Sequence, residues 1–227
     1  MSSKSKLFLI LSSVFITSLV MANIVGITKF VLLFKGLPFE MSIPVGMLAY
    51  PITFLCTDLV SELYGKKHAN FLVFVGLLMN ILLIIILSIG NFLPTDSHWI
   101  ASILKNGNSH TTQTYDIIYT LMIRATLASM VGYLIAQYID VYLFHFWKKV
   151  TKGKHLWLRN NASTMTSQLI DTIAVISITF YGVLPITTIV NYILAGYIFK
   201  VISAALDTPF MYYGVHLFKK HIETSNT

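Results

Sequence analysis

The sequence predicts an all-α integral membrane protein, a bundle of six transmembrane helices with both termini in the cytoplasm. Composition is the first reason. Of the 227 residues, 56% are apolar and 11% are charged, with a mean hydropathy of +0.73, whereas soluble domains carry about 25% charged residues. Such a chain cannot cover a water-facing surface, so we expect one transmembrane domain over residues 1–227.

Six apolar windows approach or exceed the roughly 20 residues that a helix needs to cross a bilayer. They cover about 7–34, 41–64, 69–92, 116–147, 161–185 and 187–218. The first window is longer than the apolar core of a signal peptide, which has about 7–15 residues, so we expect it to remain as a helix. The connection 182–188 is short and uncharged. It predicts that the last two helices form an antiparallel hairpin.

Basic residues are distributed unequally between the two sides of this predicted bundle. The side that holds the termini has eleven, Lys4, Lys6, Lys66, Lys67, Lys148, Lys149, Lys152, Lys154, Arg159, Lys219 and Lys220. The other side has two, Lys35 and Lys105. The positive-inside rule places the richer side in the cytoplasm. The net charge of +7 therefore indicates topology and contact with anionic lipid headgroups, not direct binding of nucleic acid.

Acidic residues inside the apolar windows are candidate site residues, because each charge there costs about 2.5–3.5 kcal/mol on insertion scales. Asp58 and Glu62 are one helical turn apart in the second window, so their carboxylates share a face and repel unless a proton or a cation neutralises one. Pro51 lies seven residues before Asp58 and cannot donate the normal helical hydrogen bond. A kink or an unwound turn is expected near these acids.

The pattern Gln-x-x-Asp occurs twice, as Gln137 to Asp140 in the fourth window and as Gln168 to Asp171 in the fifth. In each copy the amide and the carboxylate share one helical face. Thr164 extends the face of the second copy by one turn. A polar stripe of this kind must face the interior of the bundle.

Few cations oppose the five acids of the windows. Lys200 and Asp207 are seven residues apart in the last window, nearly eclipsed on a helix. Arg124 lies 16 residues from Asp140, about 24 Å along a helix, so we expect it to pair elsewhere. The excess of carboxylates suits a bound cation or a ligand rich in hydrogen-bond donors. The alternative for each residue is an interhelical bond that fixes packing.

Sequence motifs for catalysis are absent. The chain has no His-Glu-x-x-His motif, no Walker loop and no Gly-x-Ser-x-Gly elbow. Its connections are too short to hold a separate catalytic domain. We therefore expect a protein that is not an enzyme and that has no catalytic residue, no metal site and no cofactor.

Two segments resemble the queuosine precursor transporter family, which is classed with vitamin uptake transporters. They are YPITFLCTDLVSELYG at 50–65 and LWLRNNASTMTSQLIDT at 156–172. The likeness includes the segment from Gln137 to Asp140 and the tail from Lys200 to Pro209, and it covers nearly the whole chain. The resemblance implies a six-helix fold similar to the substrate-binding subunits of energy-coupling-factor transporters.

The resemblance also implies a function. It indicates an importer in the bacterial inner (cytoplasmic) membrane for a small-molecule 7-deazaguanine base used in transfer RNA modification: 7-cyano-7-deazaguanine, 7-aminomethyl-7-deazaguanine or queuine. Carried over residue by residue, it assigns substrate-binding roles to Asp58, Glu62, Ser163, Thr164, Gln168 and Asp171, with Gln137, Asp140 and Lys200 matched less closely. Arg159 lies at the cytoplasmic edge and is expected to be a gate or topology residue.

The residues suit such a base. A guanine-like edge offers adjacent N–H donors to a carboxylate, and its carbonyl needs a donor such as a glutamine amide. Asp171 with Gln168 supplies that combination. Asp58 with Glu62 is expected to neutralise an aminomethyl cation or to carry a coupling proton. The site is thus predicted between spans two, four, five and six.

Three other functions stay open on the sequence. The chain could be a substrate-binding subunit that needs a separate ATP-driven partner, an intramembrane enzyme acting on lipid or peptide, or a structural scaffold. The preferred precursor, the coupling ion and the oligomeric state are also open, with a homodimer expected because small bundles often associate in membranes.

Overall fold

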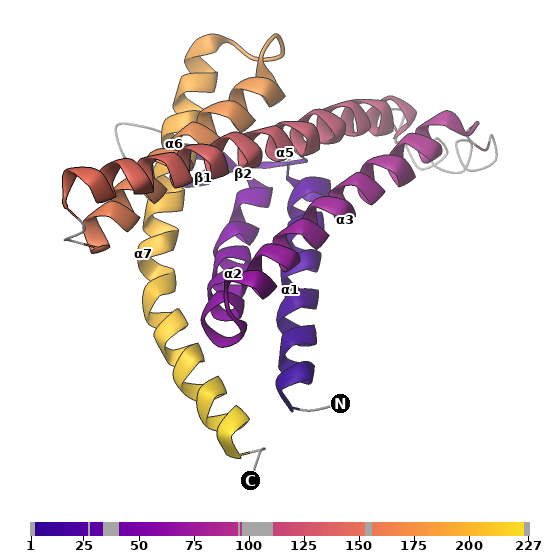
Figure 1. Cartoon of the computed structure of the whole chain (residues 1–227). Coiled ribbons are helices and arrows are strands. Elements are labelled where there is room, and N and C mark those ends of the chain that lie inside the picture. The colour runs from indigo at the N-terminus through magenta and orange to yellow at the C-terminus, as the bar shows by residue number, and fades with distance from the viewer. Residues whose placement is uncertain are drawn as a thin grey trace.

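The computed structural model describes residues 3–26, 28–33, 41–94, 96, 111–152 and 156–224, and most of them are helical. The helices are α1 (Ser3–Val25), α2 (Tyr50–Tyr64), α3 (Lys66–Phe92), α5 (Thr111–Val150), α6 (Leu156–Phe180) and α7 (Ile186–Thr224). The other elements are the strands β1 (Phe30–Leu33) and β2 (Met41–Pro44) and the 3-10 helix η1 (Val45–Ala49). In Figure 1, α1, α2 and α7 run toward the two chain ends, which lie at the same end of the molecule, and the long α5 crosses beside α6 at the other end.

The described residues 28–33 and 41–49 depart from the prediction of continuous helices over 7–34 and 41–64. α1 ends at Val25, and β1 and β2 form an antiparallel pair in which Phe30 lies opposite Pro44. Hydropathy identifies a short apolar run but does not distinguish a buried strand from a helix. For this reason the predicted boundaries were wrong here. The structure adds this small sheet to the predicted all-α fold.

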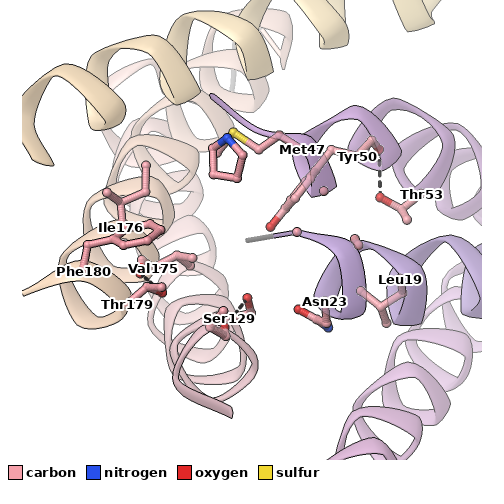
Figure 2. A pocket seen from close by; sticks show the side chains of 15 residues that line it. Leu19, Asn23, Met47, Tyr50, Thr53, Ser129, Val175, Ile176, Thr179 and Phe180 are labelled. Carbon is pink, nitrogen blue, oxygen red and sulfur yellow. Dashed lines mark hydrogen bonds between the residues drawn. The ribbon is translucent and has the colours of Figure 1, made fainter. Parts of the chain in front are cut away.

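The hairpin of β1 and β2 packs against the ends of α6 and α7 that lie nearest their connection. Ile43 is fully buried, and the ring of Phe30 stacks on that of Tyr192 with centroids 4.6 Å apart. The cluster around Ile43 consists of Met47, Ile176, Phe180, Ile189 and Ala195, three of which are visible in Figure 2. The two strands and η1 therefore pack against the protein interior through Phe30, Ile43 and Met47.

Pro51 lies in the first turn of α2 and not at a kink within it. A proline there loses no helical hydrogen bond, because the N–H groups of the first turn have no partner inside the helix. The irregular backbone predicted near the acids instead precedes the helix, as η1. The sequence thus predicted the interruption but not its position.

Among the residues that the structure describes, four helices are long and apolar enough to cross a membrane. They contain the segments Ser3–Val25, Lys67–Phe92, Tyr119–Ala136 and Ile186–Phe218, which correspond to the first, third, fourth and sixth predicted spans. α2 has 15 residues, fewer than the roughly 20 of a full span. α6 has 25 residues, and the apolar segment found among its described residues is Met165–Phe180. The chain is therefore a mostly helical, multi-pass membrane protein.

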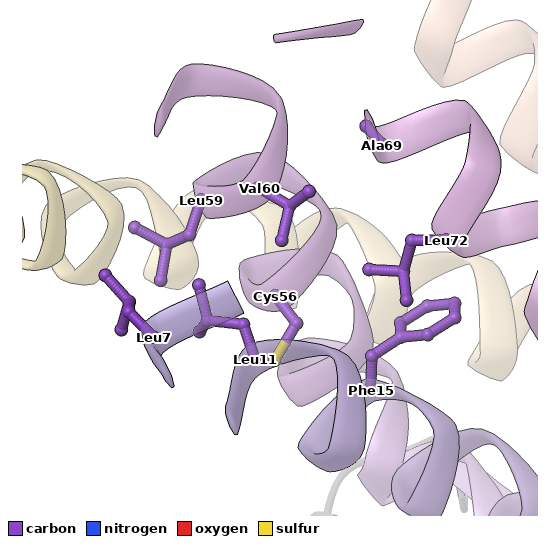
Figure 3. Packing of buried hydrophobic residues seen from close by; sticks show 8 residues of the cluster. All are labelled: Leu7, Leu11, Phe15, Cys56, Leu59, Val60, Ala69 and Leu72. Carbon is purple, nitrogen blue, oxygen red and sulfur yellow. The ribbon is translucent and has the colours of Figure 1, made fainter. Parts of the chain in front are cut away.

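α1, α2 and α3 share a buried apolar cluster near the N-terminal end of the chain (Figure 3). Leu7, Leu11 and Phe15 recur every four residues and so form one face of α1. That face contacts the buried side chains of Cys56, Leu59, Val60, Ala69 and Leu72. Gly65 makes the turn from α2 into α3 with a φ of +86°, a conformation that residues with a Cβ rarely adopt.

α6 and α7 form the antiparallel hairpin that the sequence predicted. α6 ends at Phe180 and α7 begins at Ile186, with Gly182 in the turn at a φ of +76°. This connection places the apolar halves of the two helices side by side. It also places polar residues that are far apart in the sequence, one on each of the two predicted spans, at similar depths in the membrane.

Arg124 of α5 forms hydrogen bonds with the C-terminal end of α6. Its Nη2 donates to the carbonyl oxygens of Ile178 at 3.1 Å and Tyr181 at 2.8 Å. The last carbonyls of a helix have no partner within that helix, and a cation there also opposes the negative end of the helix dipole. The expectation that Arg124 pairs away from Asp140 is confirmed.

The Arg124→Met variant is expected to lower the free energy of unfolding by about 1–2 kcal/mol, because two carbonyls lose a charged donor. Thermal unfolding in detergent measures this as a reduced midpoint. Lys67→Met, which removes an exposed lysine of α3, is the matched control. Equal midpoints for the two variants would contradict the assigned role.

Candidate functional site

A cavity of about 380 Å³ lies among five helices, within the range of about 300–1,000 Å³ that is typical of small-molecule sites. α1 and α3 form part of its wall, and α2, α5 and α6 form the rest. Its polar lining consists of Tyr50, Thr53, Thr57, Asn70, Asn80, Ser129, Tyr133, Ser167, Gln168 and Asp171. The other lining side chains are apolar.

A smaller cavity of about 90 Å³ adjoins this one toward the hairpin. The two cavities share Leu19, Tyr50, Thr53 and Ser129 as lining residues. Tyr50 extends from α2 into the smaller cavity (Figure 2). The shared residues place Tyr50 at the junction of the two spaces.

A buried ion pair lies at the wall of the larger cavity, and one of its partners, Asp171, lines the cavity. Lys200 Nζ of α7 donates to Asp171 Oδ2 of α6 at 2.5 Å, and the two side chains are 3% and 12% exposed. Lys200 Nζ also lies 5.0 Å from the centre of the Tyr50 ring. The second carboxylate oxygen, Oδ1, lies beside Gly132 of α5. Asp171 therefore lines the cavity, while Lys200 holds it from the α7 side.

Gln168 lies one turn before Asp171 on α6 and also lines the cavity. Its Oε1 is buried and has no hydrogen-bond partner among the residues that the structure describes. A buried polar atom without a partner is costly, and a glutamine amide presents either an acceptor or two donors when it turns over. A bound ligand with a matching polar edge would remove this cost.

Three cavity hydroxyls are already engaged by their own helices. Thr53 donates to a backbone carbonyl at 2.8 Å, Thr57 at 2.9 Å and Ser129 at 2.8 Å. Their hydroxyl protons are used in these bonds, so toward a ligand these groups act as acceptors. The amides, the carboxylate and the phenol hydroxyls of Tyr50 and Tyr133 are the other polar groups that could distinguish one ligand from another.

Comparison with known proteins identifies the family. The profile of the family described as "Putative vitamin uptake transporter" matches residues 44–214, about three quarters of the chain. The chain belongs to this family. The match begins at the end of β2 and extends to residue 214 of α7, so it includes α2, α3, α5 and α6, which form most of the cavity wall and supply Asp171 and Gln168, and the part of α7 that supplies Lys200.

Three curated relatives are similar to this chain at moderate identity. The "Probable queuosine precursor transporter" of Bacillus subtilis (strain 168) is 26% identical over 176 residues, 77% of this chain and 72% of the relative. The "Queuosine precursor transporter" of Escherichia coli (strain K12) is 26% identical over 136 residues, 60% of this chain. The "Probable queuosine precursor transporter" of Haemophilus influenzae is 24% identical over 136 residues. The chain spans 54% and 51% of the last two relatives, and no solved structure matches it.

The structure brings together some of the site residues predicted from the sequence. Gln168 and Asp171 line the cavity, and Lys200 contacts Asp171. The other predicted site residues of α5 and α6 have side chains outside the described part of the structure, namely Gln137, Asp140, Arg159, Ser163 and Thr164.

Asp58 and Glu62 do not line either of these two cavities, and the binding role expected for them from the sequence stays a prediction. Both are exposed on α2. They lie beyond Thr57, the last residue of α2 in the cavity wall, in the final two turns before the helix ends at Tyr64. Helical spacing had placed the two carboxylates on one face, but it had not fixed their distance from the cavity.

Polar residues that the sequence analysis passed over contribute to the site. Asn23 of α1 donates to Asn80 of α3 at 2.9 Å, and the two side chains lie in the walls of the smaller and the larger cavity. Asn70 and Tyr50 also line the larger cavity. The sequence could have indicated the asparagines, because a polar side chain inside an apolar window is expected to face another helix, as the acids are.

Proposed function

We propose that this protein imports a queuosine precursor, a 7-deazaguanine base, across the bacterial inner membrane. The supporting observation is the combination of a family of transporters, relatives named for queuosine precursors and a cavity that holds Asp171 and Gln168 between spanning helices. The protein is expected to act without an ATP-driven partner and without chemical change of the base.

The site chemistry suits a guanine-like edge. Asp171 Oδ1 lies beside Gly132 and is not part of the bond to Lys200, so it is left to accept an N–H of the base. Gln168 supplies the adjacent amide, and a base with neighbouring donors and a carbonyl can bond to both. Tyr133 and Phe54 provide aromatic surface in the same wall. The flat apolar faces of the ring would pack there.

Six spans with cytoplasmic termini remain our proposed topology. Residues 41–64 would cross as one unit made of β2, η1 and α2. Non-helical backbone is tolerated at membrane depth only where protein or a cavity covers it, and the complete burial of Ile43 and the pairing of β1 with β2 meet this condition. The excess of basic residues on the side of the termini supports the orientation.

Proteoliposomes that contain only this chain test the function. Labelled 7-cyano-7-deazaguanine, 7-aminomethyl-7-deazaguanine and queuine are supplied with and without a proton gradient. Accumulation of any of them supports an autonomous transporter. Binding without accumulation would instead indicate a substrate-binding subunit that needs an ATP-driven partner, and a chemically altered base would indicate an enzyme.

Replacement of Gln168 by leucine is expected to lower the rate of base uptake about 3- to 10-fold, because one neutral hydrogen bond contributes about 0.5–1.5 kcal/mol. Initial rates at low substrate concentration measure the effect. The control is Asn91→Leu, which makes a similar change at an exposed position of α3. An unchanged rate in Gln168→Leu would exclude the amide from the binding site.

A further inference from the structure

The larger cavity has an unusual charge balance for a site lined by a carboxylate. Among its described lining residues, Asp171 is the one side chain with a formal charge at neutral pH. The remaining polar lining groups are hydroxyls, phenols and amides. Because Lys200 donates to the same carboxylate, the pair carries no net charge.

Lys200 differs from the other predicted binding residues in its position. It is 3% exposed and lies between Asp171, which it contacts at 2.5 Å, and the ring of Tyr50. Both of these neighbours line the cavity, whereas Lys200 itself does not. Lys200 is therefore placed to act as a positioning residue, through Asp171, and the direct substrate contact expected from the sequence stays a prediction.

We propose that Lys200, by neutralising Asp171, makes this cavity selective for an uncharged 7-deazaguanine base over a cationic one. The inference rests on the proposed function and names the class of substrate within it. Among the candidate precursors, the 7-cyano base has no charge on its substituent. The 7-aminomethyl base carries an alkylammonium group, which is protonated at neutral pH.

The physical reason is the cost of removing a cation from water. A buried ammonium group is tolerated where a carboxylate pairs with it, and it costs several kcal/mol where that partner is missing. In this cavity the negative charge of Asp171 is already balanced by Lys200. The ammonium group of an aminomethyl ligand would find no unbalanced anion among the described lining groups, whereas a nitrile needs none.

Competing initial uptake rates of the 7-cyano and 7-aminomethyl bases, measured at pH 7 in proteoliposomes, test the proposal. The wild type is expected to favour the 7-cyano base at least tenfold, which corresponds to about 1.4 kcal/mol. Lys200→Met is expected to move the ratio at least tenfold toward the 7-aminomethyl base, because Asp171 then lacks its partner. Lys200→Arg keeps the charge and should keep the wild-type preference.

Lys29→Met makes the same chemical change at an exposed position and should leave the ratio unchanged. A role of Lys200 in packing alone would lower both rates together, and an unaltered ratio in Lys200→Met would overturn the proposal. Equal rates for the two bases in the wild type would overturn it without any variant. In that case uptake itself would still support the proposed function, whereas uptake of neither base would contradict both.

Discussion

The Asp171→Asn variant is expected to lose uptake of 7-deazaguanine bases while the protein still reaches the membrane. Asparagine keeps the shape of the side chain, but it removes the negative charge that faces the cavity and that pairs with Lys200. Loss of one partner of a buried, hydrogen-bonded charge pair costs about 2–5 kcal/mol. Uptake should therefore fall at least about 30-fold, the factor that corresponds to about 2 kcal/mol.

The same substitution should also lower stability, because Lys200 stays buried without a counter-ion. Gel filtration in detergent and the midpoint of thermal unfolding separate this effect from the loss of binding. Asp96→Asn, at an exposed acid beyond the end of α3, is the matched control and should keep uptake near the wild-type level. Normal uptake by Asp171→Asn would remove Asp171 from the site.

The pairing of Asp171 with Lys200 shows which part of the site the sequence could have predicted. Asp171 lies nine residues before the end of α6, and Lys200 lies fourteen residues after the start of α7. In an antiparallel hairpin these positions differ in depth by about 7 Å, a distance that the long, flexible side chain of lysine largely spans. The hairpin was predicted, but the pair was not, because Asp207 lies closer to Lys200 in sequence and nearly on the same helical face.

The positions of the long helices along the chain were easier to predict than the way in which the helices pack. Long apolar windows predict α3, α5 and α7 well, because helices of that length need little else to be recognised. The windows failed at Val25 and at Tyr50, where helices end or begin inside apolar sequence. There the conformation depends on contacts made by Ile43 and Phe30 with α6 and α7. Hydropathy contains no information about such contacts.

The sequence likewise predicted the chemical type of the site residues better than it predicted their positions. Asp58 and Asp171 are both acids inside apolar windows, and the sequence treated them alike. The structure exposes the first on α2 and buries the second against Lys200. The difference arises from the packing of α5 against α6, which encloses Asp171, and no local pattern around either residue records it.

The close approach of α5 and α6 depends on Gly132, and Gly132→Val is expected to abolish uptake. A Cβ atom at this position would lie 2.8 Å from Val175 Cγ2 and 3.0 Å from Asp171 Oδ1, closer than van der Waals contact allows. Either α5 moves away from α6 or Asp171 rotates from its bond to Lys200. Both changes alter the cavity wall on the side where the base would bind.

Overpacking of this kind costs about 1–3 kcal/mol in stability, and we expect uptake to fall at least tenfold, because the carboxylate is the group displaced. Uptake rates and thermal unfolding in detergent measure the two effects. Gly90→Val is the control, since it places the same β-branched side chain in a helix at an exposed position of α3. If Gly132→Val were as unstable as expected but still transported the base at the wild-type rate, the contact of α5 with Asp171 would matter for folding and not for transport. If Gly132→Val instead kept both the wild-type uptake rate and the wild-type stability, α5 and α6 would tolerate a valine here, and the close contact with Val175 would not limit their packing.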